Sequence, residues 1–196
     1  MAFARKYEYF DVRQMLKDAE GRASPVTGKG GHARGLHAMS PGHLDEAAQL
    51  DRVTKRGNET KKQFKKRGGV GTTGAFKTLL QQGSAACEAL NSDAGQAALA
   101  VFDNPAHAGK KLRINMEISG IKEAGFLPGT LAPHSTKVKQ GDASVSTMAT
   151  TGVMIVIDRG ANGATLQIQT CYPLSGGTAT SWKVQEMPSQ TVIASG

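Results

Sequence analysis

Two strand-like segments joined by an Asn-Gly pair constrain the fold of this chain more than any other feature. Residues 153–158 are apolar on both faces, as in a central strand that is covered on two sides. Residues 165–172 read as a second strand, and Asn162-Gly163 between the two segments is typical of a hairpin turn. The sequence therefore predicts an antiparallel β-hairpin in the second half of the chain.

The second strand of this hairpin ends in side chains that carry hydroxyl groups. Because strand side chains alternate between two faces, one face is expected to hold Leu166, Ile168, Thr170 and Tyr172. The opposite face is expected to hold Gln167, Gln169 and Cys171, and Pro173 is expected to end the strand. Thr170 and Tyr172 would then lie side by side at the edge of the core, where they can bind a phosphate. Both residue types also favour strands for structural reasons alone.

Helical patterns fill the first half of the chain and strand patterns the second. We expect helices at residues 7–20, 41–56, 73–82 and 84–102, with Gly83 separating the last two. Residues 21–42 are rich in Gly, Ser, Pro and His and are expected to form a loop. Further strands are expected at residues 112–118, within residues 137–150 and at residues 181–186. This order predicts an α+β fold, with N-terminal helices followed by an antiparallel sheet.

The charge of the chain favours a polyanionic partner. Lys and Arg number 24 against 16 Asp and Glu, which gives a formal net charge of +8. Such an excess suits a nucleic acid, an acidic protein or a membrane surface. No apolar run approaches the length of a membrane span. Aromatic residues make up only 5% of the chain, which argues against a platform that stacks many bases.

The cysteines and the N-terminus indicate which kinds of site and which route out of the cell are expected. Cys87 and Cys171 are too few for a disulfide framework, and they do not have the spacing of a zinc site. Residues 1–7 lack the apolar segment of a signal peptide. If the protein leaves its cell, we expect it to travel as part of a larger protein, with residues 1–29 as a helix or linker extension.

Three histidines, His32, His37 and His43, lie within twelve residues of each other. A histidine titrates near neutral pH and therefore suits a general acid or base. Three histidines can also bind a metal, but these spacings do not align on one helix face and no HExxH pattern is present. We therefore expect acid–base chemistry and no metal or other cofactor. A loop histidine is also a common surface residue without a function.

Cations follow the histidines along the chain. Arg52 lies late in the expected helix at residues 41–56, and a fixed guanidinium can stabilise charge that develops on a phosphate. The basic stretch that follows includes Lys62, Lys65 and Arg67, which could contact RNA. The same side chains could instead form a solvated surface or a docking site for an acidic protein. The glycine-rich residues 68–74 are not a P-loop, because no Gly-Lys-Ser/Thr follows.

The order of these features resembles a known family. The chain has Gly31-His32 and His37, then Leu50-Asp51-Arg52, then helices, and then a strand that ends Thr170-Cys171-Tyr172-Pro173. This order is similar to that of the pancreatic-ribonuclease-like (RNase A-like) toxin domains of bacterial contact-dependent inhibition proteins and related polymorphic toxins. The resemblance covers about residues 30 to 175, within a domain of residues 30–196. The segment between His37 and Arg52 is longer than in the family pattern, so Arg56 is the alternative to Arg52.

The resemblance implies a kidney-shaped α+β domain without disulfides that cleaves RNA without a metal. It assigns His37 as general base, Arg52 to the transition-state charge, and Thr170 and Tyr172 to the phosphate. His32, Lys62, Lys65 and Arg67 would bind substrate. It further implies RNA, possibly tRNA, as substrate, no cleavage of DNA, action in the cytoplasm of a target bacterium, and an acidic immunity protein as partner.

The sequence is also compatible with two other functions. An ADP-ribosyltransferase-like toxin would need an acidic catalytic residue on a late strand, and residues 165–172 contain no Glu. A non-catalytic module for RNA or protein would use the basic stretch for affinity, with the histidines incidental. Loss of activity without loss of RNA affinity in a His37 variant would distinguish the nuclease from the binding module.

Overall fold

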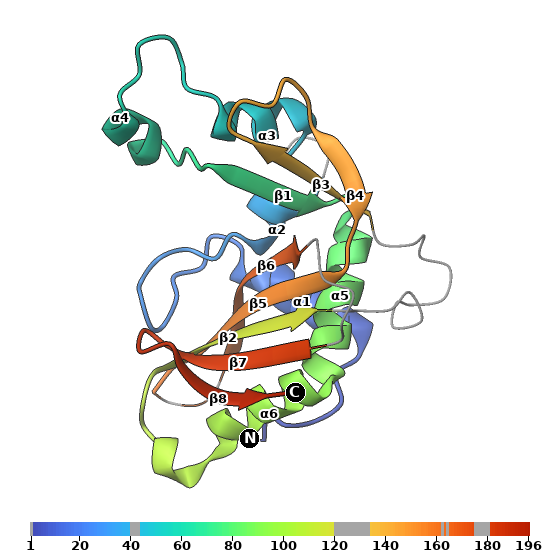
Figure 1. The fold of residues 1–196 in the computed structure, drawn as a ribbon. Helices are drawn as coiled ribbons and strands as arrows, with labels where there is room; N and C mark the ends of the chain where they lie inside the picture. The colour runs from blue at the N-terminus through green and yellow to red at the C-terminus, as the bar shows by residue number, and fades with distance from the viewer. Residues whose placement is uncertain (1, 40–43, 120–133, 162, 164, 175–180) are drawn as a thin grey trace.

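The protein folds as an α+β structure with two antiparallel sheets (Figure 1). The computed structural model describes residues 2–39, 44–119, 134–161, 163, 165–174 and 181–196. The strand orders are β1-β3-β4 in the smaller sheet and β6-β5-β2-β7-β8 in the larger one. The predicted class is therefore confirmed, but the strands form two sheets instead of one.

The elements have the following bounds. The helices are α1 (Tyr9–Ala19), α2 (Ala33–His37), α3 (Glu46–Val53), α4 (Lys61–Lys66), α5 (Leu79–Asn91), α6 (Asp93–Asp103) and the short 3-10 helix η1 (Pro105–His107). The strands are β1 (Thr72–Phe76), β2 (Leu112–Ser119), β3 (His134–Lys139), β4 (Ser146–Ala149), β5 (Gly152–Arg159), β6 (Leu166–Leu174), β7 (Ser181–Met187) and β8 (Thr191–Ser195).

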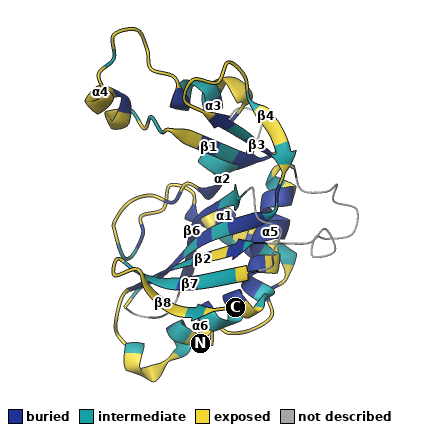
Figure 2. Ribbon diagram, viewed as in Figure 1, coloured by how far each residue is buried: buried dark blue, intermediate teal, exposed yellow. Residues whose placement is uncertain are grey.

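The main core lies between one face of the larger sheet and helices α1, α5 and α6 (Figures 1 and 2). Ile114, Ile155 and Ile168 from three neighbouring strands meet Leu90 and Phe102 from the helices, and all are at least 98% buried. Residues 1–29 contribute to the same core through α1, where Val12 and Leu16 are buried. Burial of such side chains stabilises a fold by about 1.5–3 kcal/mol each.

The predicted hairpin is confirmed, because β5 and β6 pair antiparallel along their length. The predicted faces of β6 are wrong beyond Ile168. A β-bulge lets Val156 pair with Thr170 while Ile157 pairs with Ile168, so Gln169 is an extra residue. Cys171 consequently joins the core, and Thr170 and Tyr172 turn to the opposite face. The strand also continues through Pro173 to Leu174.

The expected helix at residues 73–82 is wrong, because β1 occupies its first half. Thr72 and Thr73 are β-branched and favour a strand, and β1 pairs with β3. Thr78 then caps α5, its hydroxyl accepting a hydrogen bond from the Gln81 amide at 3.1 Å. Helix α5 passes through Gly83 without a break. A side chain at that position would meet the ring of Tyr9 at 2.9 Å, so the glycine lets α1 pack closely on α5.

The other N-terminal predictions are confirmed in part. The helix at residues 7–20 is α1, in which Val12 and Leu16 are buried and Phe10 is 76% exposed. The segment 21–42 contains the short helix α2 in place of a continuous loop. Helix α3 is shorter than expected and starts after Asp45, whose carboxylate accepts a hydrogen bond from the Ala48 amide at 2.7 Å. The expected start at Ser40-Pro41 lies outside the described residues.

The C-terminal segment completes the larger sheet. The strand predicted at residues 181–186 is β7, which pairs with β2 inside the sheet, and β8 is an additional edge strand that the sequence did not indicate. The strand pattern in residues 137–150 corresponds to β3 and β4. Cys87 and Cys171 are both free thiols.

The smaller sheet forms a second lobe with α3 beside it, and α2 lies between the two lobes (Figure 1). Gln49 on α3 is fully buried and donates a hydrogen bond to the Thr136 hydroxyl on β3 at 2.8 Å. The two ends of α2 join the lobes, because Ala38 pairs with Phe76 of β1 and the His32 amide donates a hydrogen bond to the Gln169 carbonyl of β6. This junction of the two lobes contains the site described below.

Candidate functional site

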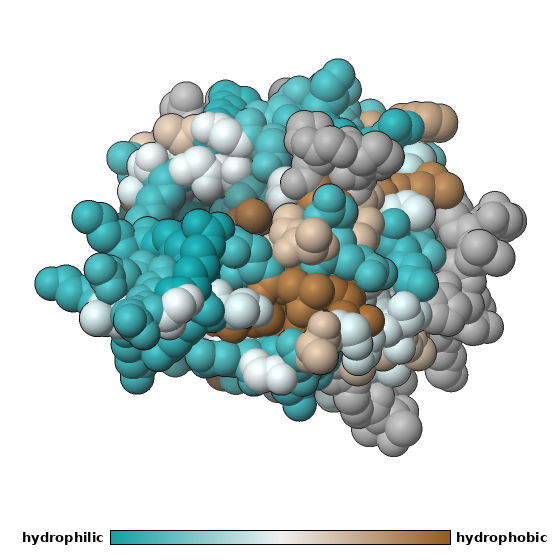
Figure 3. Space-filling model, turned by 90° about the horizontal axis from the view of Figure 1, so that it is seen from above, coloured by the Kyte–Doolittle hydropathy of each residue, from teal (hydrophilic) through white to brown (hydrophobic). Residues whose placement is uncertain are grey.

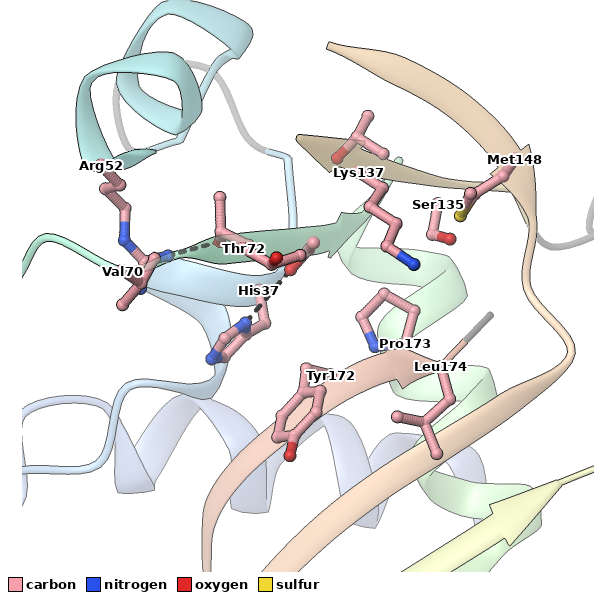
Figure 4. Close-up of a pocket in the computed structure, with 13 residues that line it drawn as sticks. His37, Arg52, Val70, Thr72, Ser135, Lys137, Met148, Tyr172, Pro173 and Leu174 are labelled. Atoms are coloured by element: carbon pink, nitrogen blue, oxygen red, sulfur yellow. Dashed lines mark hydrogen bonds between the residues drawn. The ribbon is translucent and has the colours of Figure 1, made fainter. Parts of the chain in front are cut away.

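A cavity of about 400 Å³ lies at the junction of the two lobes. Residues from α2, α3, β1, β3, β4 and β6 line it, together with Val70. His37, Arg52, Lys137 and Tyr172 approach this space from four different elements (Figure 4). The fold therefore brings together three of the four catalytic residues that the sequence predicts, from segments more than a hundred residues apart.

Backbone and glutamine contacts fix α2 against β6. The His32 amide donates a hydrogen bond to the Gln169 carbonyl at 3.0 Å, at the bulge. The buried Gln82 side chain donates to the carbonyls of Ala33 at 2.6 Å and Cys171 at 3.0 Å. At Gly31 a side chain would lie 2.3 Å from the Ala19 carbonyl oxygen, so only glycine allows this approach to α1. These contacts hold His37 over the end of β6.

His37 has a defined tautomer. Its Nδ1 lies 3.2 Å from the carbonyl oxygen of Gly74. Because a carbonyl can only accept, Nδ1 carries the hydrogen and Nε2 keeps a free lone pair. The pKa of His37 is lowered from 6.5 to about 4, mainly by burial and in smaller part by the charges of His32 and Arg52, while the Gly74 hydrogen bond acts in the opposite direction. The imidazole is therefore neutral at physiological pH and able to accept a proton.

Two rings flank His37. The Tyr172 ring lies 5.1 Å from it between centroids, and the His32 ring lies 5.6 Å away on the exposed side. Burial raises the pKa of Tyr172, and the negative charge of Glu117 raises it too. The phenol thus keeps its proton at neutral pH and can donate it, or a hydrogen bond, to an oxygen beside His37.

Arg52, and not Arg56, reaches the cavity. Its Nη1 donates to the Thr73 hydroxyl at 2.9 Å and to the Leu36 carbonyl at 3.3 Å. These two acceptors are neutral, so the guanidinium keeps its positive charge uncompensated beside His37. Arg56 instead forms a bidentate ion pair with Asp51 on the surface, at 2.7 and 2.9 Å.

Lys137 is a cavity residue that the sequence analysis missed. It lies on β3 directly opposite Gly74, the residue whose carbonyl orients His37. Its amino group projects into the cavity from the side opposite Arg52 (Figure 4). No motif marks it in the sequence. Its position follows from the pairing of β1 with β3, and β1 itself was predicted as a helix.

The remaining predicted residues lie in different places. Thr170 is 8% exposed on the same face as Tyr172, and its hydroxyl has no hydrogen-bond partner in the described structure, but it does not line the cavity. Lys62 and Lys65 lie on α4, away from His37. The Arg67 guanidinium is held by Asp51 and Glu59, at 3.2 and 2.8 Å. His43 is outside the described residues.

The described cavity lining combines a neutral imidazole, two cations and a phenol, and it includes no Asp or Glu. Such a site suits an anionic ligand and proton transfer at that ligand. Within the described ranges, no cluster of three or more His, Cys, Asp or Glu side chains is placed to hold a metal ion. No helix in the described part of the chain is long and apolar enough to cross a membrane.

The chain matches no protein family model, no curated protein and no solved structure in comparisons with known proteins.

Proposed function

We propose that this protein is a ribonuclease that cleaves RNA through the ribose 2′-OH and needs no metal for the reaction. The observation that carries the proposal is the pairing of a tautomer-fixed, neutral His37 with the cation of Arg52 in one cavity. A neutral imidazole can remove the 2′-OH proton, and a guanidinium can stabilise a phosphate that gains negative charge. Both groups are supplied by the chain itself.

The chemistry would proceed in one displacement. Nε2 of His37 accepts the 2′-OH proton while the 2′-oxygen forms a bond to phosphorus and the bond to the 5′-oxygen breaks. The 5′-oxygen leaves with a proton from the Tyr172 phenol or from water, and the product carries a 2′,3′-cyclic phosphate. Because the nucleophile belongs to the substrate, DNA should not react.

Arg52 and Lys137 would divide the charge stabilisation. They reach the cavity from opposite sides, so one can contact each side of a phosphate between them (Figure 4). Bound phosphate would also offset the positive potential that lowers the pKa of His37, and so make the imidazole a stronger base in the complex. Thr170, whose hydroxyl has no hydrogen-bond partner in the described structure, does not line the cavity and would support the site from behind Tyr172 on the same strand face.

The setting follows from the resemblance to RNase A-like toxin domains. A basic ribonuclease delivered into a competitor's cytoplasm as part of a larger toxin would endanger its own producer. We therefore also propose an acidic immunity protein that covers the positively charged cavity. Expression without that protein should stop growth, and normal growth with abundant active protein would count against this part of the proposal.

The direct test uses a DNA oligonucleotide that contains one ribonucleotide. We expect cleavage only on the 3′ side of that ribonucleotide, in excess chelator, with a 2′,3′-cyclic phosphate end that mass spectrometry can identify. Cleavage at deoxynucleotides, or products with 5′-phosphate ends, would disprove the mechanism. Tight binding without any cleavage of this substrate or of cellular RNA would favour the non-catalytic module.

A further inference from the structure

A second cavity, of about 770 Å³, lies beside helix α4. Lys55, Lys61 and Lys65 line it together with Phe64, residues 68–71 and Gln140. We call this hollow the lysine groove. The lysines that line this groove are only partly those expected from the sequence to contact RNA, because Lys65 lines it but Lys62 and Arg67 do not.

The positive charge of the lysine groove is not neutralised by its surroundings. Two acids in this lobe already pair with arginines, because Asp51 pairs with Arg56 and Arg67, and Glu59 pairs with Arg67. The three lysines are exposed and form no ion pair in the described structure, and no Asp or Glu is among the described residues that line the groove. Three like charges that face one hollow favour a bound polyanion.

The lysine groove lies next to the cavity that contains His37 and Arg52. Val70 lines both hollows, and its amide donates a hydrogen bond to the carbonyl of Arg52 at 2.8 Å. A nucleic acid bound beside Arg52 could therefore extend past Val70 toward the lysines. Seen from above, the α4 side of this lobe is hydrophilic, while hydrophobic residues gather near the middle of the face (Figure 3).

The groove fits a nucleic acid backbone better than a protein surface. Protein interfaces bury an apolar centre, but the only large apolar side chains here are Val70 and Phe64, and Phe64 is 5% exposed. Successive phosphates present one charge each at regular intervals, which matches lysines spaced along a hollow. Flexible lysines recognise phosphates as point charges and impose no base preference.

We infer that the lysine groove binds the phosphates of RNA that flanks the cleaved phosphate, so that the preferred substrate is an extended single strand instead of a dinucleotide. This inference rests on the proposed ribonuclease function. It adds a binding site for flanking nucleotides, separate from His37 and Arg52, that determines how affinity depends on substrate length and salt.

The test compares two triple variants with the wild type. In the first, Lys55, Lys61 and Lys65 are changed to Gln. In the matched control, the exposed Lys29, Lys110 and Lys111, which line neither cavity, are changed to Gln. The probe is a fluorescent, 2′-O-methylated oligoribonucleotide that cannot be cleaved, titrated at several salt concentrations. Cleavage of an unmodified dinucleoside phosphate is measured in parallel.

We expect the groove variant to bind the probe about tenfold or more weakly, with a salt slope smaller by about 2, because each phosphate contact to a single strand contributes about 0.7. Its cleavage of the dinucleoside phosphate should equal that of the wild type, and the control variant should match the wild type in both assays. If the groove variant and the wild type bind the probe with equal affinity and equal salt slope, the inference is wrong. The lysines would then be candidates for binding an acidic protein. Absence of cleavage by the wild type would instead overturn the ribonuclease function, whatever the binding result.

Discussion

At the scale of single residues, the carbonyl of Gly74 decides what His37 can do. The hydrogen bond of 3.2 Å fixes the proton on Nδ1, and burial keeps the imidazole neutral. Arg52 sits beside it with its charge unpaired, whereas Arg56 pairs with Asp51. The two arginines therefore differ in what they can bind. In the described structure Arg56 is paired with a carboxylate and Arg52 is not.

The partly buried His37 should make stability depend on pH. Its folded pKa of about 4 lies below the ordinary 6.5, so the unfolded chain binds more protons between these values. The stabilisation is complete above pH 6.5 and is lost as pH falls toward 4. Between neutral pH and pH 4, the unfolding free energy of His37→Gln should therefore fall by about 3 kcal/mol less than that of the wild type.

Chemical denaturation of both proteins at a series of pH values measures this difference. All other titrating groups are shared, so they cancel in the comparison. Parallel stability profiles for the wild type and His37→Gln would show that the imidazole is not buried in its neutral form.

The two arginines give a matched pair for activity. Arg52→Ala removes the cation that would stabilise the transition state, and kcat/KM for RNA should fall about 10²- to 10³-fold. Arg56→Ala removes a surface ion pair and should change kcat/KM by less than about twofold, because such pairs contribute little. The reverse order of effects would move the catalytic role to Arg56.

At the scale of elements, the bulge at Gln169 and the buried Gln82 place the site. The bulge turns Thr170 and Tyr172 away from the core, and its Gln169 carbonyl accepts the hydrogen bond from His32. Gln82 then joins α2 to β6 through two backbone carbonyls. A short helix such as α2 is not stable alone, so these contacts hold it in position.

Gln82→Leu should therefore destabilise the protein by about 2 kcal/mol, because two carbonyls lose their buried donor. It should also reduce activity, since α2 carries His37. Gln81→Leu is the control, because the Gln81 side chain is also buried but, unlike Gln82, donates no hydrogen bond to α2 or β6 in the described structure. Denaturant unfolding measures both changes, and equal loss in the two variants would argue against the role of Gln82.

At the scale of the whole molecule, local patterns predicted the hairpin, α1 and β2, because each depends on side chains near in sequence. The faces of β6 could not be predicted, because a bulge depends on register with the neighbouring strand. The strand β1 was missed because its partner β3 lies about sixty residues later. Lys137 was missed for the same reason.

Three residues predicted for the site lie together, although an element between them was predicted incorrectly. His37, Arg52 and Tyr172 meet in one cavity although the helix expected at residues 73–82 was wrong. The order of motifs along the chain indicated these residues without the secondary structure between them. The groove lysines required the structure, since only folding shows which cations of a basic run face a hollow and which, like Arg67, are held by acids.

The proposed role of His37 as the base in metal-independent RNA cleavage can be tested directly. The measurement is the rate of cleavage of total RNA in excess EDTA by the wild type and by His37→Gln, with circular dichroism to show that both are folded. We predict fragments with cyclic-phosphate ends from the wild type and a rate at least about 10²-fold lower for the variant. Equal cleavage by both proteins, or none by the folded wild type, would contradict this account.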